Sequence, residues 1–175
     1  MPDRNTRAYA AERRSHVPRE QRETDMTTFK VEESLTIKAR AEQLYAVVAD
    51  YRVGHPAILP KPYFQELTVE QGGMGAGTIV RGRVKVMGRS FPLHHLVSEP
   101  EPGRVLQESD LDKPGEFTRF IFEPLDGGAQ TRVTIATEFV PSPGLMGLLE
   151  RLTKPGMARN MYQQELRNLA DYVGA

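Results

Sequence analysis

The chain of 175 residues contains no cysteine and no tryptophan, and it carries no excess of charge of either sign. The absence of cysteine excludes disulfides, thiolate zinc sites, iron–sulfur clusters and cysteine nucleophiles. Because 23 basic residues balance 23 acidic ones, charge gives no reason to expect nucleic acid or an anionic membrane as a partner. No apolar run approaches the roughly 18 residues typical of a membrane-spanning helix. We therefore expect a soluble, cytoplasmic protein with no integral membrane segment.

Several sequence motifs of catalysis are also missing. The glycine-rich stretch Gly72–Gly77 matches neither a dinucleotide fingerprint nor a P-loop, and no G-x-S-x-G nucleophile motif is present. No His-x-x-His or His-Glu-x-x-His pair occurs, so we expect no metal site and no cofactor. Any chemistry has to come from histidine, tyrosine, arginine or carboxylate side chains.

Residues 1–26 differ in composition from the rest of the chain. They are rich in arginine and acidic residues, and before Met26 their only sizeable apolar side chains after Met1 are Tyr9 and Val17. Ordering such a segment would lose more entropy than burial could return. We predict a disordered extension at 1–26, with an arginine-rich docking arm as the alternative, and one folded domain at 27–175. Met26 is a candidate translation start.

The rest of the chain switches between two hydrophobic periods. A period of two from Thr28 to Lys38 predicts a strand, and helical spacing from Ala41 predicts a helix that Gly54 and Pro56 end. The proline-rich stretch 55–62 predicts a loop with at most one short turn. The alternation then predicts six more strands, at Tyr63–Glu70, Thr78–Met87, Phe91–Ser98, Val105–Asp110, Phe117–Glu123 and Thr131–Val140.

Helical spacing returns after Gly144. Four leucines form one stripe, and further residues suggest its continuation toward the C-terminus: Leu145, Leu148, Leu149 and Leu152, then Met161, Glu165, Leu166, Leu169 and Tyr172. Pro155 and Gly156 should kink or split this helix. An antiparallel sheet with one apolar face needs a cover, and only this helix is long enough to supply it. A curved sheet around such a helix would leave space for a ligand cavity.

Four segments carry a resemblance to a known family. They are Val31–Ile37 with Ala41–Asp50; Gly75–Val80; Val97–Leu106; and Phe122–Gly128 with Thr131–Thr134 and Gly144–Leu152. In order and spacing they resemble the START-like, helix-grip (SRPBCC) superfamily, in its polyketide cyclase/dehydrase and lipid-transport branch. The resemblance implies an α+β fold with a curved antiparallel sheet of about seven strands wrapped around a long C-terminal helix. One or two short helices should follow the first strand.

Two adjacent histidines are the main candidates for chemistry. His94 and His95 must point to opposite faces of their predicted strand. If Leu93, His95 and Val97 share the apolar face, His95 faces the cavity, where it could exchange a proton with an enolisable substrate. Tyr63 is the second catalytic candidate. His55 and His16 fall in the predicted loop and extension, with no carboxylate placed beside either.

The predicted cavity wall follows from the same alternation. Its candidate residues are Leu59, Tyr63, Val84, His95, Val97, Phe120, Phe122, Ile135, Met157 and Met161. Arg81, Arg83 and Lys85 alternate with valines, which predicts that they lie on the solvated face instead of clamping an acidic ligand.

Three functions are compatible with these observations. The first is binding of a hydrophobic small molecule, lipid- or polyketide-like, in the internal cavity. The second is an enzyme of the cyclase/dehydrase kind that uses cavity histidine and tyrosine as acid and base. The third is a macromolecular interaction protein, which should show a large exposed apolar or single-sign patch. The first needs only a cavity, whereas the second needs at least two converging titratable groups.

Overall fold

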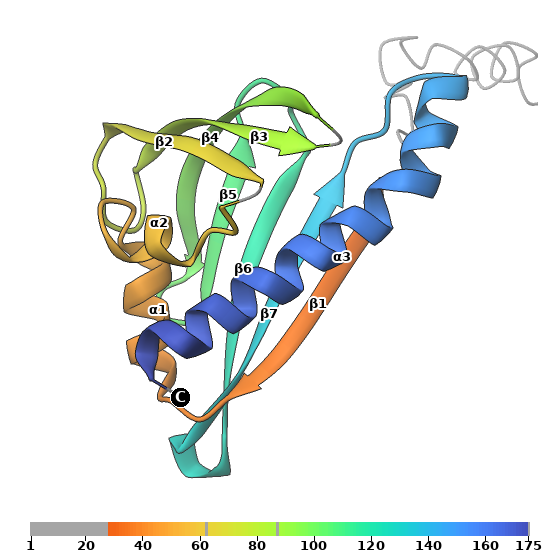
Figure 1. The fold of residues 1–175 in the computed structure, drawn as a ribbon. Helices are drawn as coiled ribbons and strands as arrows, with labels where there is room; N and C mark the ends of the chain where they lie inside the picture. Colours follow the sequence, from red (N-terminus) through yellow and green to blue (C-terminus); the bar gives the residue numbers. More distant parts are fainter. Residues whose placement is uncertain (1–27, 62, 87, 175) are drawn as a thin grey trace, which may run out of the picture.

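The computed structural model describes residues 28–61, 63–86 and 88–174. They form one seven-stranded antiparallel sheet in the order β1-β7-β6-β5-β4-β3-β2, crossed by a long C-terminal helix (Figure 1). The elements in chain order are β1 (Phe29–Ile37), α1 (Ala41–Ala49), α2 (Gly54–Ile58), β2 (Phe64–Gln71), β3 (Ile79–Val86), β4 (Arg89–Glu101), β5 (Val105–Asp110), β6 (Phe117–Leu125), η2 (Asp126–Gly128), β7 (Gln130–Phe139) and α3 (Leu145–Val173). The predicted helix-grip fold, including the short helices after the first strand, is confirmed.

The sheet is a meander that is completed by its first strand. β2 to β7 pair with their neighbours in sequence, whereas β1 pairs with β7 from Phe29↔Phe139 to Ile37↔Thr131. The alternating residues of each strand place one set of side chains on an inner face and the other set outside. Arg81, Arg83 and Lys85 are exposed, as predicted for the outer face.

The core lies between this inner face, α1 and the C-terminal half of α3. Its members from the sheet include Leu106, Phe120, Phe122, Val133 and Ile135, and α3 contributes Ala158, Tyr162, Leu166 and Leu169. α3 lies along β1 and β7, and its C-terminal half reaches α1 and α2 (Figure 1). Burial of these apolar side chains is the main force that holds the helix on the sheet.

The N-terminal leucines of α3 do not join this core. Leu145, Leu148, Leu149 and Leu152 are all exposed, together with Met146, and we call these five side chains the leucine face. At 100° per residue, their stripe is offset by about 100° from the stripe of Ala158, Tyr162 and Leu169. The prediction of one continuous buried stripe is therefore wrong.

The residues of this half of α3 that do pack on the preceding loop and the sheet include small and charged ones. Gly147 packs so closely on the preceding loop that a Cβ atom there would lie 2.0 Å from the Ser142 carbonyl oxygen. Arg151 and Lys154 place their cationic groups over the rings of Phe29 and Phe139. The helix also runs through Pro155 without a break, so the predicted split does not occur.

Two further predictions concern the N-terminal extension and a membrane-spanning segment. The predicted extension at 1–26 lies outside the described residues. Within the part of the chain that the structure describes, no helix is both long enough and apolar enough to cross a membrane.

Two leucines on α3 test the assignment of its buried and exposed faces. Leu169 is 2% exposed and Leu152 is 74% exposed. Leu169→Ala should lower the free energy of unfolding by about 2–5 kcal/mol, because it leaves a cavity in the core. Leu152→Ala should change it by less than about 0.5 kcal/mol. Urea denaturation of both variants measures this difference, and equal losses would contradict the assignment.

Candidate functional site

The inner face of the sheet carries a buried carboxyl group beside a histidine. The register pairs Val97 of β4 with Glu108 of β5, and His95 lies two residues before Val97, so all three side chains share this face. Glu108 is buried, and its Oε2 lies 3.5 Å from Nδ1 of His95. The contact is an ion pair but not a well-formed hydrogen bond, and Nδ1 has no hydrogen-bond partner among the described residues. The predicted inward orientation of His95 agrees with this position.

The segment around α2 brings two more polar side chains to the same carboxyl group. The Tyr51 hydroxyl donates a hydrogen bond of 2.6 Å to Oε1 of Glu108. Nε2 of His55 lies 3.6 Å from this oxygen, while Nδ1 lies 2.8 Å from the Val48 carbonyl oxygen, to which it donates. The Tyr51 and His55 rings stack with centroids 4.5 Å apart. We call Tyr51, His55, His95 and Glu108 the buried polar cluster.

The ionisable groups of this cluster stabilise one another's charged forms. Burial by itself would raise the pKa of the Glu108 carboxyl group, but the His95 and His55 imidazoles and the Tyr51 hydroxyl outweigh it and lower this pKa to about 2. Burial would lower the pKa of His95, yet Glu108 outweighs it and raises that pKa above its usual value. Glu108 is therefore an anion near neutral pH, and it stabilises a proton on His95.

A second carboxyl group faces the interior from α3. Glu165 is 4% exposed, and no described residue forms a hydrogen bond with its Oε1 atom. Burial raises its pKa well above the usual value, and the nearby Glu108 charge adds to this effect. The pKa values of the two carboxyl groups are thus shifted in opposite directions, a pattern typical of sites where proton positions matter.

An apolar surface leads from solvent to the polar cluster. Along the inner face of β4, Phe91 is 50% exposed, Leu93 is half-buried, the His95 side chain is 16% exposed and Val97 is 1% exposed. Val84 of β3, directly opposite Phe91, is also only half-buried. We call Val84, Phe91 and Leu93 the apolar ramp. It ends at His95, whose Nε2 atom has no partner among the described residues.

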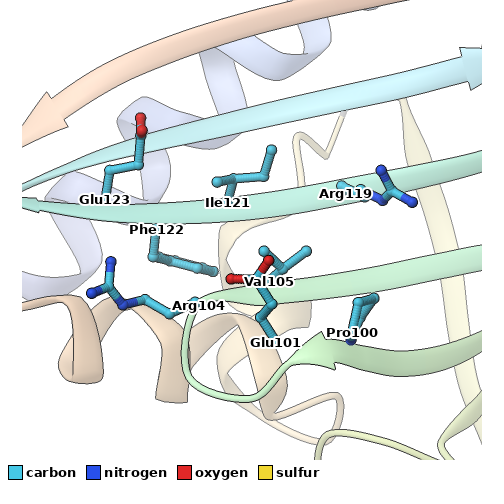
Figure 2. A pocket seen from close by; sticks show the side chains of 8 residues that line it. All are labelled: Pro100, Glu101, Arg104, Val105, Arg119, Ile121, Phe122 and Glu123. Atoms are coloured by element: carbon cyan, nitrogen blue, oxygen red, sulfur yellow. The ribbon is translucent and has the colours of Figure 1, made fainter.

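Two open grooves of about 500 Å³ lie elsewhere on the molecule. One is on the outer face of the sheet, where Arg119, Ile121 and Glu123 of β6 lie beside Arg104 and Val105 (Figure 2). The other lies between the α2 region and the end of α3, and its lining includes Leu59, Asn168 and Tyr172. Neither groove contains the buried polar cluster.

The predicted cavity residues other than His95 occupy two kinds of position. The fully buried ones, which belong to or border the core, are Leu59, Val97, Phe120, Phe122 and Ile135. The half-buried ones are Tyr63, Val84, Met157 and Met161. No hydrogen bond or ion pair joins Tyr63 to His95 among the described residues, so the role of Tyr63 as a catalytic partner stays a prediction. The same holds for ligand contact by the whole set.

The sequence did not place a carboxylate beside His55, but the structure brings one there. α2 turns this side chain inward, where Glu108 lies 3.6 Å away. Sequence reasoning also missed Glu108 itself, because the segment Val105–Asp110 is too polar to show which face is buried. The available signal was the position of Glu108 two residues after Leu106, in phase with an apolar residue.

The curved antiparallel sheet, the long C-terminal helix across it and the short helices after the first strand define a protein of the START-like, helix-grip class. A family model described as "Polyketide cyclase / dehydrase and lipid transport" matches residues 28–174, so the chain belongs to this family. A search of the curated proteins finds no match to the sequence.

Several solved structures share the fold. The KanY protein has 21% sequence identity and a TM-score of 0.72, over 85% of this chain and 99% of that one. The Zhui aromatase/cyclase from Streptomyces sp. R1128 has 19% identity and a TM-score of 0.69, over 83% and 93%. A START superfamily protein from Mycobacterium smegmatis has 18% identity and a TM-score of 0.55, over 82% and 93%. At these identities the likeness shows the fold alone.

The buried polar cluster predicts how stability depends on pH. The pKa of Glu108 is lowered in the folded state, so its stabilisation is present above the unfolded value of about 4.5 and is lost as the pH falls toward about 2. The pKa of His95 is raised, so its stabilisation is present below the unfolded value of about 6.5 and is lost as the pH rises through the folded value.

The urea midpoint, measured across the pH range, tests both losses of stability. Glu108→Gln should reduce the change in midpoint at acid pH, and His95→Gln should reduce the change above about pH 6.5. His94→Gln is the matched control, because this neighbour points away from Glu108 and pairs with Glu70 and Asp112. If the His94 and His95 variants had the same pH profile, the ion pair with Glu108 would not be the cause.

Proposed function

We propose that the chain binds a hydrophobic small molecule, lipid- or polyketide-like, on the inner face of the sheet between β3, β4 and α3. The observation that carries this proposal is the gradient of burial along β4, from the exposed Phe91 to the buried Val97, with His95 between them. A ligand that covered the apolar ramp would gain about 25 cal/mol per Å² of apolar surface removed from water. Its polar end would meet the His95 side chain.

The family supports a small molecule as the ligand. Its description joins cyclases, dehydrases and lipid transport, and one similar structure is that of an aromatase/cyclase. Small-molecule sites also commonly combine an apolar wall with a few polar groups, as the apolar ramp and His95 do.

A charge on the ramp tests the binding proposal. Leu93→Glu should weaken binding of the uncharged dye Nile red at least about tenfold, because the ligand would have to bury an unpaired carboxylate. Fluorescence titration of the full chain measures the dissociation constant. Leu152→Glu is the control, since it places the same charge on the leucine face, where the dye could also adsorb.

The control separates specific binding from adsorption. Leu152→Glu should leave the dissociation constant unchanged. A Leu93→Glu protein that binds the dye as tightly as the wild type would rule out the ramp as the site. Native mass spectrometry of gently purified protein should in addition detect a co-purified apolar molecule.

A second candidate function is acid–base catalysis of the cyclase/dehydrase kind. The observation that favours it is the pairing of His95 with the buried Glu108 at the end of the ramp. Nδ1 faces the carboxylate, which leaves Nε2 for a ligand. A neutral His95 could remove a proton from the carbon between two ketone groups, and the resulting imidazolium would be stabilised by Glu108. The imidazolium would then exchange its proton with solvent, and delivery of this solvent-derived proton to the enolate carbon would complete the exchange.

Deuterium exchange of a simple 1,3-diketone tests this candidate. We expect the wild-type chain to accelerate exchange at 1-phenylbutane-1,3-dione, with a rate that rises with pH until His95 is fully neutral. His95→Gln should lower the catalysed rate by roughly 100-fold or more, whereas His94→Gln should not. Proton NMR measures the exchange, and equal rates in the two variants would rule out His95 as the base.

A further inference from the structure

Glu165 is an unusual residue for the buried side of α3. Its neighbours on that face are Tyr162, Leu166 and Leu169, and all of them belong to the core. An ionised carboxylate in this place would need a cation or several hydrogen-bond donors to offset its lost hydration. Instead, its Oε1 atom has no hydrogen-bond partner in the described part of the chain. A leucine or glutamine would be less costly here, which indicates that the carboxyl group serves a purpose other than stability.

Three titratable groups interact electrostatically with Glu165, one acid and two phenols. β5 contributes Glu108, the segment between α1 and α2 contributes Tyr51, and α3 itself contributes Tyr162, one turn away. The Tyr51 hydroxyl is used by Glu108, and the Tyr162 hydroxyl forms a hydrogen bond with Thr137. With Glu108 ionised, the field at Glu165 favours its neutral form. A neutral carboxyl group has an O–H to donate.

We propose that Glu165 is a hydrogen-bond donor that selects ligands with an uncharged oxygen acceptor, such as a ketone, over ligands that carry a carboxylate. A ketone oxygen would provide the partner that Glu165 lacks. A carboxylate ligand would place a second negative charge close to Glu108, and the O–H of Glu165 would face an ionised group instead of a neutral acceptor, so this ligand should bind less well. This inference rests on the proposed binding function, and it adds the chemical class of the ligand.

Three naphthalenes of matched shape test the selection. They are 2-acetylnaphthalene with a ketone, 2-ethylnaphthalene with no acceptor, and 2-naphthoate with a carboxylate. Each is titrated against the full chain loaded with Nile red, and the displacement gives its affinity. For the wild type near neutral pH, we expect the ketone to bind about 3- to 10-fold more tightly than the ethyl compound, as one hydrogen bond would give. The carboxylate should bind more weakly than either.

Two variants assign the effect to Glu165. Glu165→Gln keeps a donor and should keep the preference for the ketone at every pH. Glu165→Leu removes the donor and should abolish the preference. In the wild type the preference should fall as the pH rises far enough to ionise Glu165. Infrared spectroscopy adds an independent readout, because a protonated carboxyl band at neutral pH should be absent from Glu165→Gln and should shift when the ketone binds.

The outcomes are distinguishable. If no naphthalene displaces the dye, the proposed binding function fails. If the ketone and ethyl compounds bind equally well, or if the carboxylate binds as tightly as the ketone, binding stands and the role of Glu165 is wrong. If the infrared band of a protonated carboxyl group remained in both Glu165 variants, the proposed role would also be overturned. The band would then come from another group, and the Glu165 carboxyl group of the wild type would be ionised. Should Glu165→Leu fail to fold, Glu165→Gln and the infrared band still decide the question.

Discussion

The carboxylate of Glu108 is a charge buried between a sheet and a helix, and much of the surrounding structure satisfies it. A buried anion is tolerated only with close and well-placed partners. β4 supplies His95, and the segment through α2 supplies Tyr51 and His55. The contacts of Tyr51 and His55 with Glu108 join parts of the chain that are more than 50 residues apart. The short helix α2 contains a proline, and it is held in place by the contacts of His55, by the burial of Ile58 in the core and by a hydrogen bond from Asn168 to the Ile58 carbonyl oxygen.

The same arrangement connects stability with function. The imidazole of His95 stands where the apolar ramp ends, so the group that stabilises Glu108 is also the polar group that an incoming ligand would meet. The two proposed functions, ligand binding and acid–base catalysis, therefore share one site and differ only in whether His95 transfers a proton. The leucine face stands apart from this site. No described element covers it, so it is the kind of exposed apolar patch that the macromolecular interaction alternative expects. That alternative stays a prediction.

Much of the fold could be predicted from the sequence, because the strands other than the polar β5 alternate clearly enough to show their inner faces. The inward orientation of His95 followed from its neighbours Leu93 and Val97. Glu108 could not be placed in this way, since only the register with Val97 across two strands reveals its surroundings. His55 was missed because prolines made α2 look like a loop. The leucine stripe misled for a different reason. An apolar stripe shows that a helix has an apolar face, but not that this face is buried. Here the angular offset from the stripe of Ala158, Tyr162 and Leu169 would have shown that the leucines point elsewhere.

The pairing of β1 with β7 has a consequence for how the chain reaches this structure. The two strands are about 100 residues apart in sequence (Ser34↔Thr134), and contacts of such long range slow folding because a large loop must close first. On a ribosome, β1 emerges early and has no partner until β7 has been made, and α3, which packs on β1, comes later still. An unpaired strand is prone to aggregation. Its outer face carries charged and hydroxyl side chains, namely Lys30, Glu32, Ser34 and Thr36. These polar side chains oppose aggregation until β7 has been synthesised.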